Sequence, residues 1–386
     1  MVLFHLYGLA AFAQDARDPD IFMELNLRYG KVLHHPNRDF LEDLYFNSYE
    51  FRFGLQSSGE NNWEKPLNYP ITGIALRFTN YTDYSDSDEL QQRQKDIMGS
   101  NLALFGYLQA PIIRFHRFNW HFQLGMGFGV FSKIYDEITN PENVLISTRV
   151  TPYINFQTGF DIQLNDRLDL TLNANYTHAS NASWKFPNYG INEVQGLAGI
   201  RYHIHPGLST FVPMEKSEFK PSGSMFVAVE PGWMWSRYNN YYYFKTGTSF
   251  GYERQLHPVF RVGGAVEAHY IHSLGPSPEF RIEDEYSIPD VLTTGSLYAF
   301  GELCFGRFAF HVGFGTYVFR SPKNIELAKS GARGGSLYTI PAFFERSGFR
   351  IDLGEKRTHF VGAILRAHYP VADYLAFVYG YKFKHK

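Results

Sequence analysis

A histidine and a serine separated by one residue form the most chemically suggestive pair in this sequence. His178 and Ser180 lie at the end of a run in which apolar and polar residues alternate, a pattern typical of a β-strand. Residues i and i+2 of a strand point to the same side and start about 6.6 Å apart, so an imidazole can reach a serine hydroxyl. Such a pair can supply a general base and an activated nucleophile for acyl transfer. The spacing alone is a weak signal, because it recurs by chance in many chains.

The strand that carries the pair has an apolar side and a polar side. His178 and Ser180 share their side with Leu168, Leu170, Leu172, Ala174 and Tyr176, whereas Asp169, Thr171, Asn173, Asn175 and Thr177 share the other. A polar pair on an apolar side that faces lipid is costly unless it has a partner or a purpose. The alternative is that the aqueous rim begins at His178 and both side chains are simply hydrated.

The rest of the chain is also predicted to form strands. Its 386 residues are 44% hydrophobic and 18% aromatic, with 36 Phe, 27 Tyr and 34 Gly, a bias that favours strands and tight turns over helices. No run approaches the roughly 20 apolar residues that a membrane-spanning helix needs. We therefore expect an all-β fold of about 16 strands, most of them longer than the usual five or six residues.

The alternation along these strands predicts a transmembrane antiparallel β-barrel of the outer-membrane type. In Tyr49–Phe53 the aromatic residues fall on one side of the strand, and Glu50 and Arg52 fall on the other. An apolar outer face and a polar inner face are the inverse of a water-soluble barrel and match a membrane barrel. Long polar loops alternate with tight turns, which predicts that both chain ends lie on the periplasmic side.

The predicted strands fall into two sets of eight. Residues 205–222 are predicted to be a linker between an eight-strand module at 14–204 and a second one at 223–386. Arg117–Phe131 resembles Arg307–Phe319, which indicates an internal duplication. One barrel of about 16 strands and two barrels of eight both remain open. We favour the single barrel, because two membrane barrels in one chain would be the rarer solution.

Charge and cysteine content exclude several kinds of function. The net charge of −2 provides no electrostatic footprint for nucleic acid. The single cysteine, Cys304, cannot form an internal disulfide or a cysteine-based metal cluster. His34 and His35 have no further ligand at suitable spacing, so no metal site is predicted. Residues 1–13 resemble a secretory signal peptide without its positive n-region, so we expect an exported protein.

The stretch His178–Ala182, followed by Pro187, Asn188, Gly190 and Ile191, closely resembles the active-site sequence of the PagL-like lipid A 3-O-deacylases, also called the acyloxyacyl hydrolase family. The resemblance covers about residues 21–204 and is strongest over 176–193; Tyr135–Asn143 fits less specifically. It implies an outer-membrane barrel enzyme that removes the ester-linked acyl chain at position 3 of lipid A without a cofactor. Lipopolysaccharide of the bacterial outer membrane would be its partner.

Carried over by position, the resemblance implies that His178 is the base and Ser180 the nucleophile. The family's third residue is a glutamate twelve residues after the serine, a position that Asn192 occupies here, with Glu193 beside it. Alternation predicts that Asn192 shares the side of His178 and that Glu193 faces the lumen, unless a one-residue slip in register reverses the two. An asparagine can orient an imidazole but lacks the charge that stabilises an imidazolium. We therefore expect lower activity or a shifted pH optimum.

Asn181 and the backbone amides near Ala182 and Gly190 are candidates for the oxyanion hole. The second half carries a related sequence around His368, but Pro370 replaces the serine, so we expect His368 to face the lumen without a catalytic role. A different class of function remains open, namely a barrel with a structural, adhesive or pore role that has inherited the motif without the activity.

Overall fold

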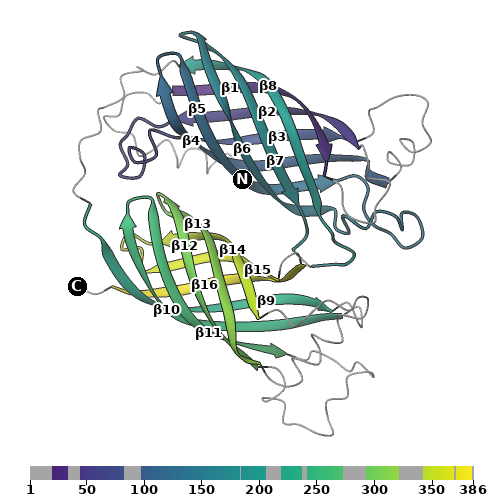
Figure 1. Ribbon diagram of the computed structural model, residues 1–386, viewed down its shortest axis with the longest axis vertical. Helices are drawn as coiled ribbons and strands as arrows, with labels where there is room; N and C mark the ends of the chain where they lie inside the picture. The colour runs from purple at the N-terminus through teal and green to yellow at the C-terminus, as the bar shows by residue number, and fades with distance from the viewer. Residues whose placement is uncertain are drawn as a thin grey trace. The chain divides into compact units, whose positions relative to one another are not determined.

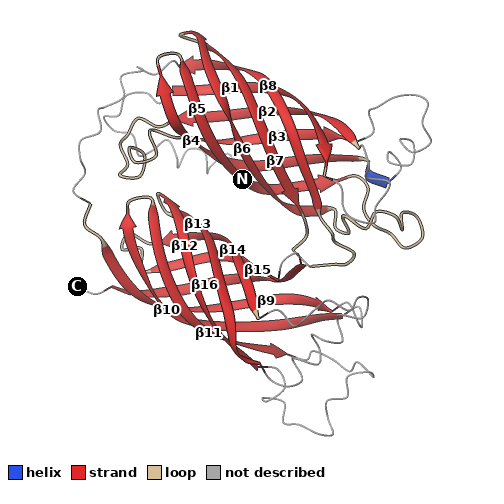
Figure 2. Ribbon diagram, in the orientation of Figure 1, coloured by secondary structure: helices blue, strands red, loops and turns tan. Residues whose placement is uncertain are grey.

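The computed structural model describes residues 20–33, 44–81, 97–182, 184–205, 219–236, 241–272, 293–320, 342–368 and 371–384. The expected signal peptide at 1–13, His34, His35 and most of the 205–222 linker lie outside these ranges. Within them the chain is built almost entirely of antiparallel strands (Figures 1 and 2). Among the described residues, no helix is long and apolar enough to cross a membrane.

Sixteen strands follow one another along the described chain. The first eight are β1 (Asp20–Val32), β2 (Tyr45–Gln56), β3 (Ile71–Asn80), β4 (Ser100–Phe115), β5 (Phe118–Phe131), β6 (Val150–Asn165), β7 (Leu168–Ala179) and β8 (Ile191–His205). The second eight are β9 (Ser222–Ser236), β10 (Tyr241–His257), β11 (Phe260–His272), β12 (Thr293–Phe305), β13 (Phe308–Arg320), β14 (Phe343–Leu353), β15 (His359–His368) and β16 (Val371–Lys384).

The strands close into two separate barrels, β1 to β8 and β9 to β16 (Figure 1). β1 pairs with β8 and β9 pairs with β16, so neither sheet has an open edge. The predicted all-β barrel fold with two sets of eight strands is confirmed, but our preference for a single barrel is wrong. Eight strands suffice to close a barrel whose interior is filled by side chains. The alternation along the strands is the same in both arrangements and could not distinguish them.

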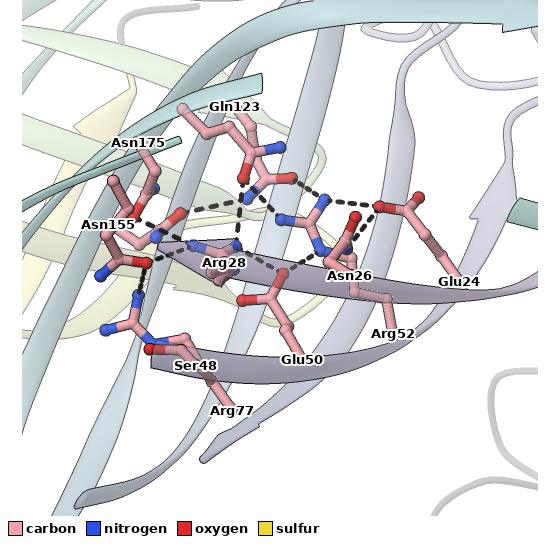
Figure 3. Close-up of polar contacts among 12 residues, drawn as sticks. Glu24, Asn26, Arg28, Ser48, Glu50, Arg52, Arg77, Gln123, Asn155 and Asn175 are labelled. Carbon is pink, nitrogen blue, oxygen red and sulfur yellow. Dashed lines mark hydrogen bonds and ion pairs between the residues drawn. The ribbon is translucent and has the colours of Figure 1, made fainter. Parts of the chain in front are cut away.

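Polar residues line the inside of each barrel and apolar residues cover the outside. On β1, Glu24 and Arg28 are buried, whereas Leu25 and Leu27 are 57% and 60% exposed. Charged groups in the first lumen are paired: Glu50 Oε1 lies 2.6 Å from Arg28 Nη2 and 2.5 Å from Arg52 Nε (Figure 3). Buried charges are tolerated only when they are paired. The pairing of these groups therefore indicates that the first barrel has a stable polar interior.

The second barrel has a charge network of its own. Arg346 lies between two carboxylates, 2.9 Å from Glu230 and 2.5 Å from Glu267. His368 faces this interior, as predicted, and its Nε2 lies 2.9 Å from the Tyr317 hydroxyl. Both barrels therefore follow the rule that distinguishes membrane barrels from water-soluble ones, with the apolar surface outside.

The loop before β6 contributes to the site, and β6 itself begins only at Val150. Leu145 and Ile146 are buried in the loop before it, although their apolar pattern resembles that of a strand. The Asn143 side chain holds this loop by accepting a hydrogen bond from the Ile146 amide at 3.3 Å and donating one to the Ile97 carbonyl at 3.0 Å.

Candidate active site

β7 and β8 bring His178 and Asn192 together on the outer side of the first barrel. The two residues are direct cross-strand partners, and His178 Nδ1 lies 2.8 Å from Asn192 Oδ1. An amide oxygen can only accept a hydrogen bond, so Nδ1 carries the proton and Nε2 keeps its lone pair. The imidazole can therefore accept a proton at Nε2.

Tyr176 is a third member of this cluster that the sequence reasoning missed. Its hydroxyl donates a hydrogen bond of 2.7 Å to Asn192 Oδ1, the same atom that His178 contacts. An aromatic residue on the apolar side of a membrane strand indicates a lipid contact, so nothing in the sequence pointed to a polar role. With two donors on one oxygen, the orientation of the Asn192 amide is fixed.

Glu193 points into the lumen, on the opposite side of β8 from Asn192. It is 1% exposed, its Oε2 lies 2.9 Å from Arg77 Nη2, and its Oε1 accepts a hydrogen bond from the Tyr81 hydroxyl. The register between β7 and β8 runs without a shift from Leu168 to Ala179, so the slip that would reverse these two residues does not occur. The imidazole of His178 therefore meets an amide and not a carboxylate.

Ser180 follows the last residue of β7 and opens a loop with an unusual backbone. Ala182 has a φ of 55°, in the left-handed region that residues other than glycine seldom adopt, and its amide donates to Ser180 Oγ at 3.4 Å. The Asn181 amide donates to Asn188 Oδ1 at 3.1 Å, and Asn181 Nδ2 donates to the Lys185 carbonyl at 2.7 Å. Strained conformations of this kind persist where surrounding contacts enforce them, often at functional sites.

Gly190 ties the start of β8 to the loop before β6. Its amide donates to the Leu145 carbonyl at 3.0 Å, and its φ of 75° suits a residue without a Cβ. Asn143, which holds that loop, belongs to the Tyr135–Asn143 stretch that resembled the family less specifically. Because its amide is already engaged, Gly190 supports the backbone next to Ile191 in this structure.

A groove of about 630 Å³ lies on the outer face of the first barrel next to this cluster. Tyr176 and Val194 line it close to Asn192, and its smallest lining residues include Ala174 and Gly196, which are cross-strand partners. A Cβ added at Gly196 would meet no atom within 4 Å. The volume falls in the range typical of ligand sites, roughly 300–1,000 Å³.

One cluster elsewhere has the residue types of a metal site. Glu230, Glu267 and His269 offer ligand atoms within 4.8 Å of one another inside the second barrel. Arg346 contacts both carboxylates, and Arg366 also contacts Glu267. A cation would have to compete with two guanidinium groups, so this cluster is better explained as part of the ion-pair network.

Comparison with known families explains both halves of the chain. Residues 47–201 match the family described as lipid A 3-O-deacylase (PagL), and residues 222–385 match the C-terminal domain of acyloxyacyl hydrolase. The first barrel, which holds residues 47–201, belongs to the PagL lipid A 3-O-deacylase family. It is thus an outer-membrane β-barrel from a family of ester hydrolases, and the half that the resemblance left unexplained corresponds to a domain of its own.

Solved structures with similarity to the chain include other barrels. The outer membrane enzyme PagL is 14% identical over 46% of this chain and 97% of its own, with a TM-score of 0.31. Neisserial surface protein A is 10% identical over 47% of this chain and 96% of its own, with a TM-score of 0.30. The comparison with curated proteins gave no match.

Proposed function

We propose that this protein hydrolyses the ester-linked acyl chain at position 3 of lipid A, using Ser180 as the nucleophile. The observation that carries the proposal is the hydrogen bond between His178 Nδ1 and Asn192 Oδ1 on the outer side of the barrel. It leaves Nε2 free to act as a base on the surface that would face lipid. The first barrel also belongs to a family whose description names this reaction.

In the proposed mechanism, Ser180 Oγ attacks the ester carbonyl while His178 Nε2 takes the hydroxyl proton. The tetrahedral intermediate collapses, and the imidazolium gives that proton to the departing sugar oxygen. A water molecule, deprotonated by the same nitrogen, then hydrolyses the acyl-enzyme and releases the fatty acid. The Ala182 amide, supported by Asn181 and Gly190, is the proposed donor to the oxyanion.

Asn192 would orient the imidazole and fix its tautomer. It cannot neutralise the positive charge that His178 acquires in the transition state, whereas a glutamate at this position could. Glu193 would not replace it, because Glu193 is bound to Arg77 inside the barrel. We therefore propose an active but slow enzyme that needs no cofactor.

The groove beside Tyr176 would hold the acyl chain of the substrate. Its floor at Ala174 and Gly196 leaves room that larger side chains would fill. A substrate whose acyl chains are already in the outer leaflet would then reach Ser180 by lateral diffusion, without leaving the bilayer. The partner is accordingly lipopolysaccharide, and export would use the signal peptide proposed at residues 1–13.

Mass spectrometry of lipid A tests this proposal directly. Cells that produce the wild-type chain should contain lipid A lighter by one hydroxyacyl group, and cells that produce Ser180→Ala should not. Heat-dependent migration in gels would verify that both barrels are folded. Unchanged lipid A in cells with correctly inserted wild-type protein would contradict the proposal and favour a structural, adhesive or pore role.

A further inference from the structure

A buried arginine spans the lumen directly behind the candidate site. Arg77 on β3 is 0% exposed, and its Nη1 donates a hydrogen bond to Thr177 Oγ1 at 3.1 Å while its Nη2 lies 2.9 Å from Glu193 Oε2. Thr177 and Glu193 are cross-strand partners on β7 and β8. Thr177 directly precedes His178, and Glu193 directly follows Asn192, so one guanidinium group holds both strands at the position of the site.

Further contacts fix the two ends of this bridge. The Tyr81 hydroxyl donates to Glu193 Oε1, and Gln195 Nε2 donates to Glu193 Oε2 at 2.8 Å. The Arg77 guanidinium also lies over the ring of Tyr153, 4.8 Å from its centroid. A charged pair with this many fixed partners has little freedom to reorient, because each movement would leave a buried polar group without a partner.

We propose that Arg77, Thr177 and Glu193 are positioning residues that align the His178–Asn192 pair from the inside of the barrel. The proposal rests on the function proposed above. Successive side chains of a strand point to opposite faces, so fixing a lumenal side chain also fixes the direction of its outward neighbour. The pair lies one residue from the end of β7 and one residue after the start of β8, where strands otherwise fray.

This arrangement gives Glu193 a role that does not require it to touch the imidazole. In the sequence, the Glu193 carboxylate next to Asn192 resembles the family's catalytic glutamate displaced by one residue. In the structure, Glu193 connects β8 to β3 across the lumen through its ion pair with Arg77. The outward amide of Asn192 is thereby presented to His178 at hydrogen-bonding distance.

A double-mutant cycle separates positioning from general stabilisation. Arg77→Gln should lower kcat by about 10- to 100-fold with KM nearly unchanged, because alignment matters in the transition state. In an Asn192→Ala background the same substitution should lower kcat less than about threefold, since the aligned contact is already lost. Equal losses in both backgrounds would overturn the proposal.

Arg52→Gln is the matched control. Arg52 is also 0% exposed in the same lumen, but its hydrogen-bond and ion-pair partners Glu24, Glu50, Gln123 and Gln157 lie on β1, β2, β5 and β6, and the Tyr107 ring below its guanidinium lies on β4. It should lower the unfolding temperature about as much as Arg77→Gln and leave kcat within about twofold of wild type. A loss of kcat as large as that of Arg77→Gln would mean that Arg77 acts only on stability, and the proposal would be wrong.

Two further measurements test the proposal if Arg77→Gln does not fold or if the wild-type protein is inactive. If Arg77→Gln does not fold, Thr177→Val removes one contact of the same arginine with little change in shape, and kcat should fall in the same direction. If the wild-type protein does not deacylate lipid A, the proposed function fails, but the alignment is still visible in the imidazole ¹⁵N NMR shifts of His178. Those shifts should change in Arg77→Gln or Thr177→Val and not in Arg52→Gln; unchanged shifts would refute the positioning role.

Discussion

At the residue scale, the site is defined by which oxygen His178 contacts. Asn192 Oδ1 accepts hydrogen bonds from both His178 Nδ1 and the Tyr176 hydroxyl. The group that fixes the imidazole tautomer is therefore a neutral amide. A neutral partner orients the ring as well as a carboxylate does, but it provides no compensation for the charge that develops on the ring. We therefore expect kcat to depend on which residue occupies position 192.

Asn192→Glu should raise kcat by about 10-fold or more, because a carboxylate at the same place stabilises the imidazolium, and Asn192→Ala should lower it. The measurement is the rate of fatty-acid release from lipid A in detergent micelles. Glu193→Gln is not a neutral control, since Glu193 holds Arg77. No gain in kcat for a folded Asn192→Glu variant would contradict the role assigned to Asn192.

Tyr176→Phe should lower kcat by about 3- to 10-fold, the effect of one lost hydrogen bond, while the apolar contact with the groove is kept. The expected cause is greater freedom of the Asn192 amide. Steady-state kinetics on the same substrate would show it. A Tyr176→Phe enzyme as fast as wild type would mean that His178 alone suffices to orient Asn192.

At the scale of elements, β7 and β8 carry both the reactive groups and the groove. Ala174 and Gly196 face each other across these strands and keep the outer surface low beside Tyr176. A glycine in a strand often marks a close approach of a ligand. Here the free space above Gly196 allows a larger side chain to enter without displacing the barrel.

Gly196→Phe should therefore lower kcat/KM by about 10-fold or more for long acyl chains and less for short ones, because the ring would occupy the groove. Unfolding temperature should stay close to that of wild type. Ala198→Phe is the matched control, since Ala198 lies on the same exposed face of β8 outside the groove lining. Equal activity of the two variants on all chain lengths would contradict the assignment of the groove.

At the scale of the whole molecule, each barrel closes on its own strands and has its own buried cluster. No strand of one barrel completes the sheet of the other in the described part of the chain. Backbone hydrogen bonds within each barrel are thus satisfied internally, which is the requirement for a stable membrane barrel. The candidate site uses strands of the first barrel only.

Residues 1–204 should therefore fold as a barrel without the second half and retain at least about a tenth of the wild-type kcat, since β1 to β8 pair only with one another. Heat-dependent gel migration would report folding, and lipid A mass spectrometry would report activity. A folded but inactive first barrel would show that the second half contributes to catalysis.

The sequence by itself determined the features that depend on local alternation. A period of two predicts that His178 and Asn192 share a side and that Glu193 faces inward, and it predicts a polar interior such as that around Arg52. The short motif that runs from His178 at the end of β7 to Ile191 at the start of β8 indicated the family. These properties require only neighbouring residues, so they can be read without knowing which strands pair.

The tertiary structure decided everything that depends on contacts between distant strands. The pairing of β1 with β8 makes two barrels out of a pattern that fits one equally well. The bond from Tyr176 to Asn192 depends on side-chain direction across a strand pair, and the bridge from Arg77 to Glu193 crosses the lumen between residues 116 positions apart. Alternation gives the side of each residue, but closure of the sheet selects its partner.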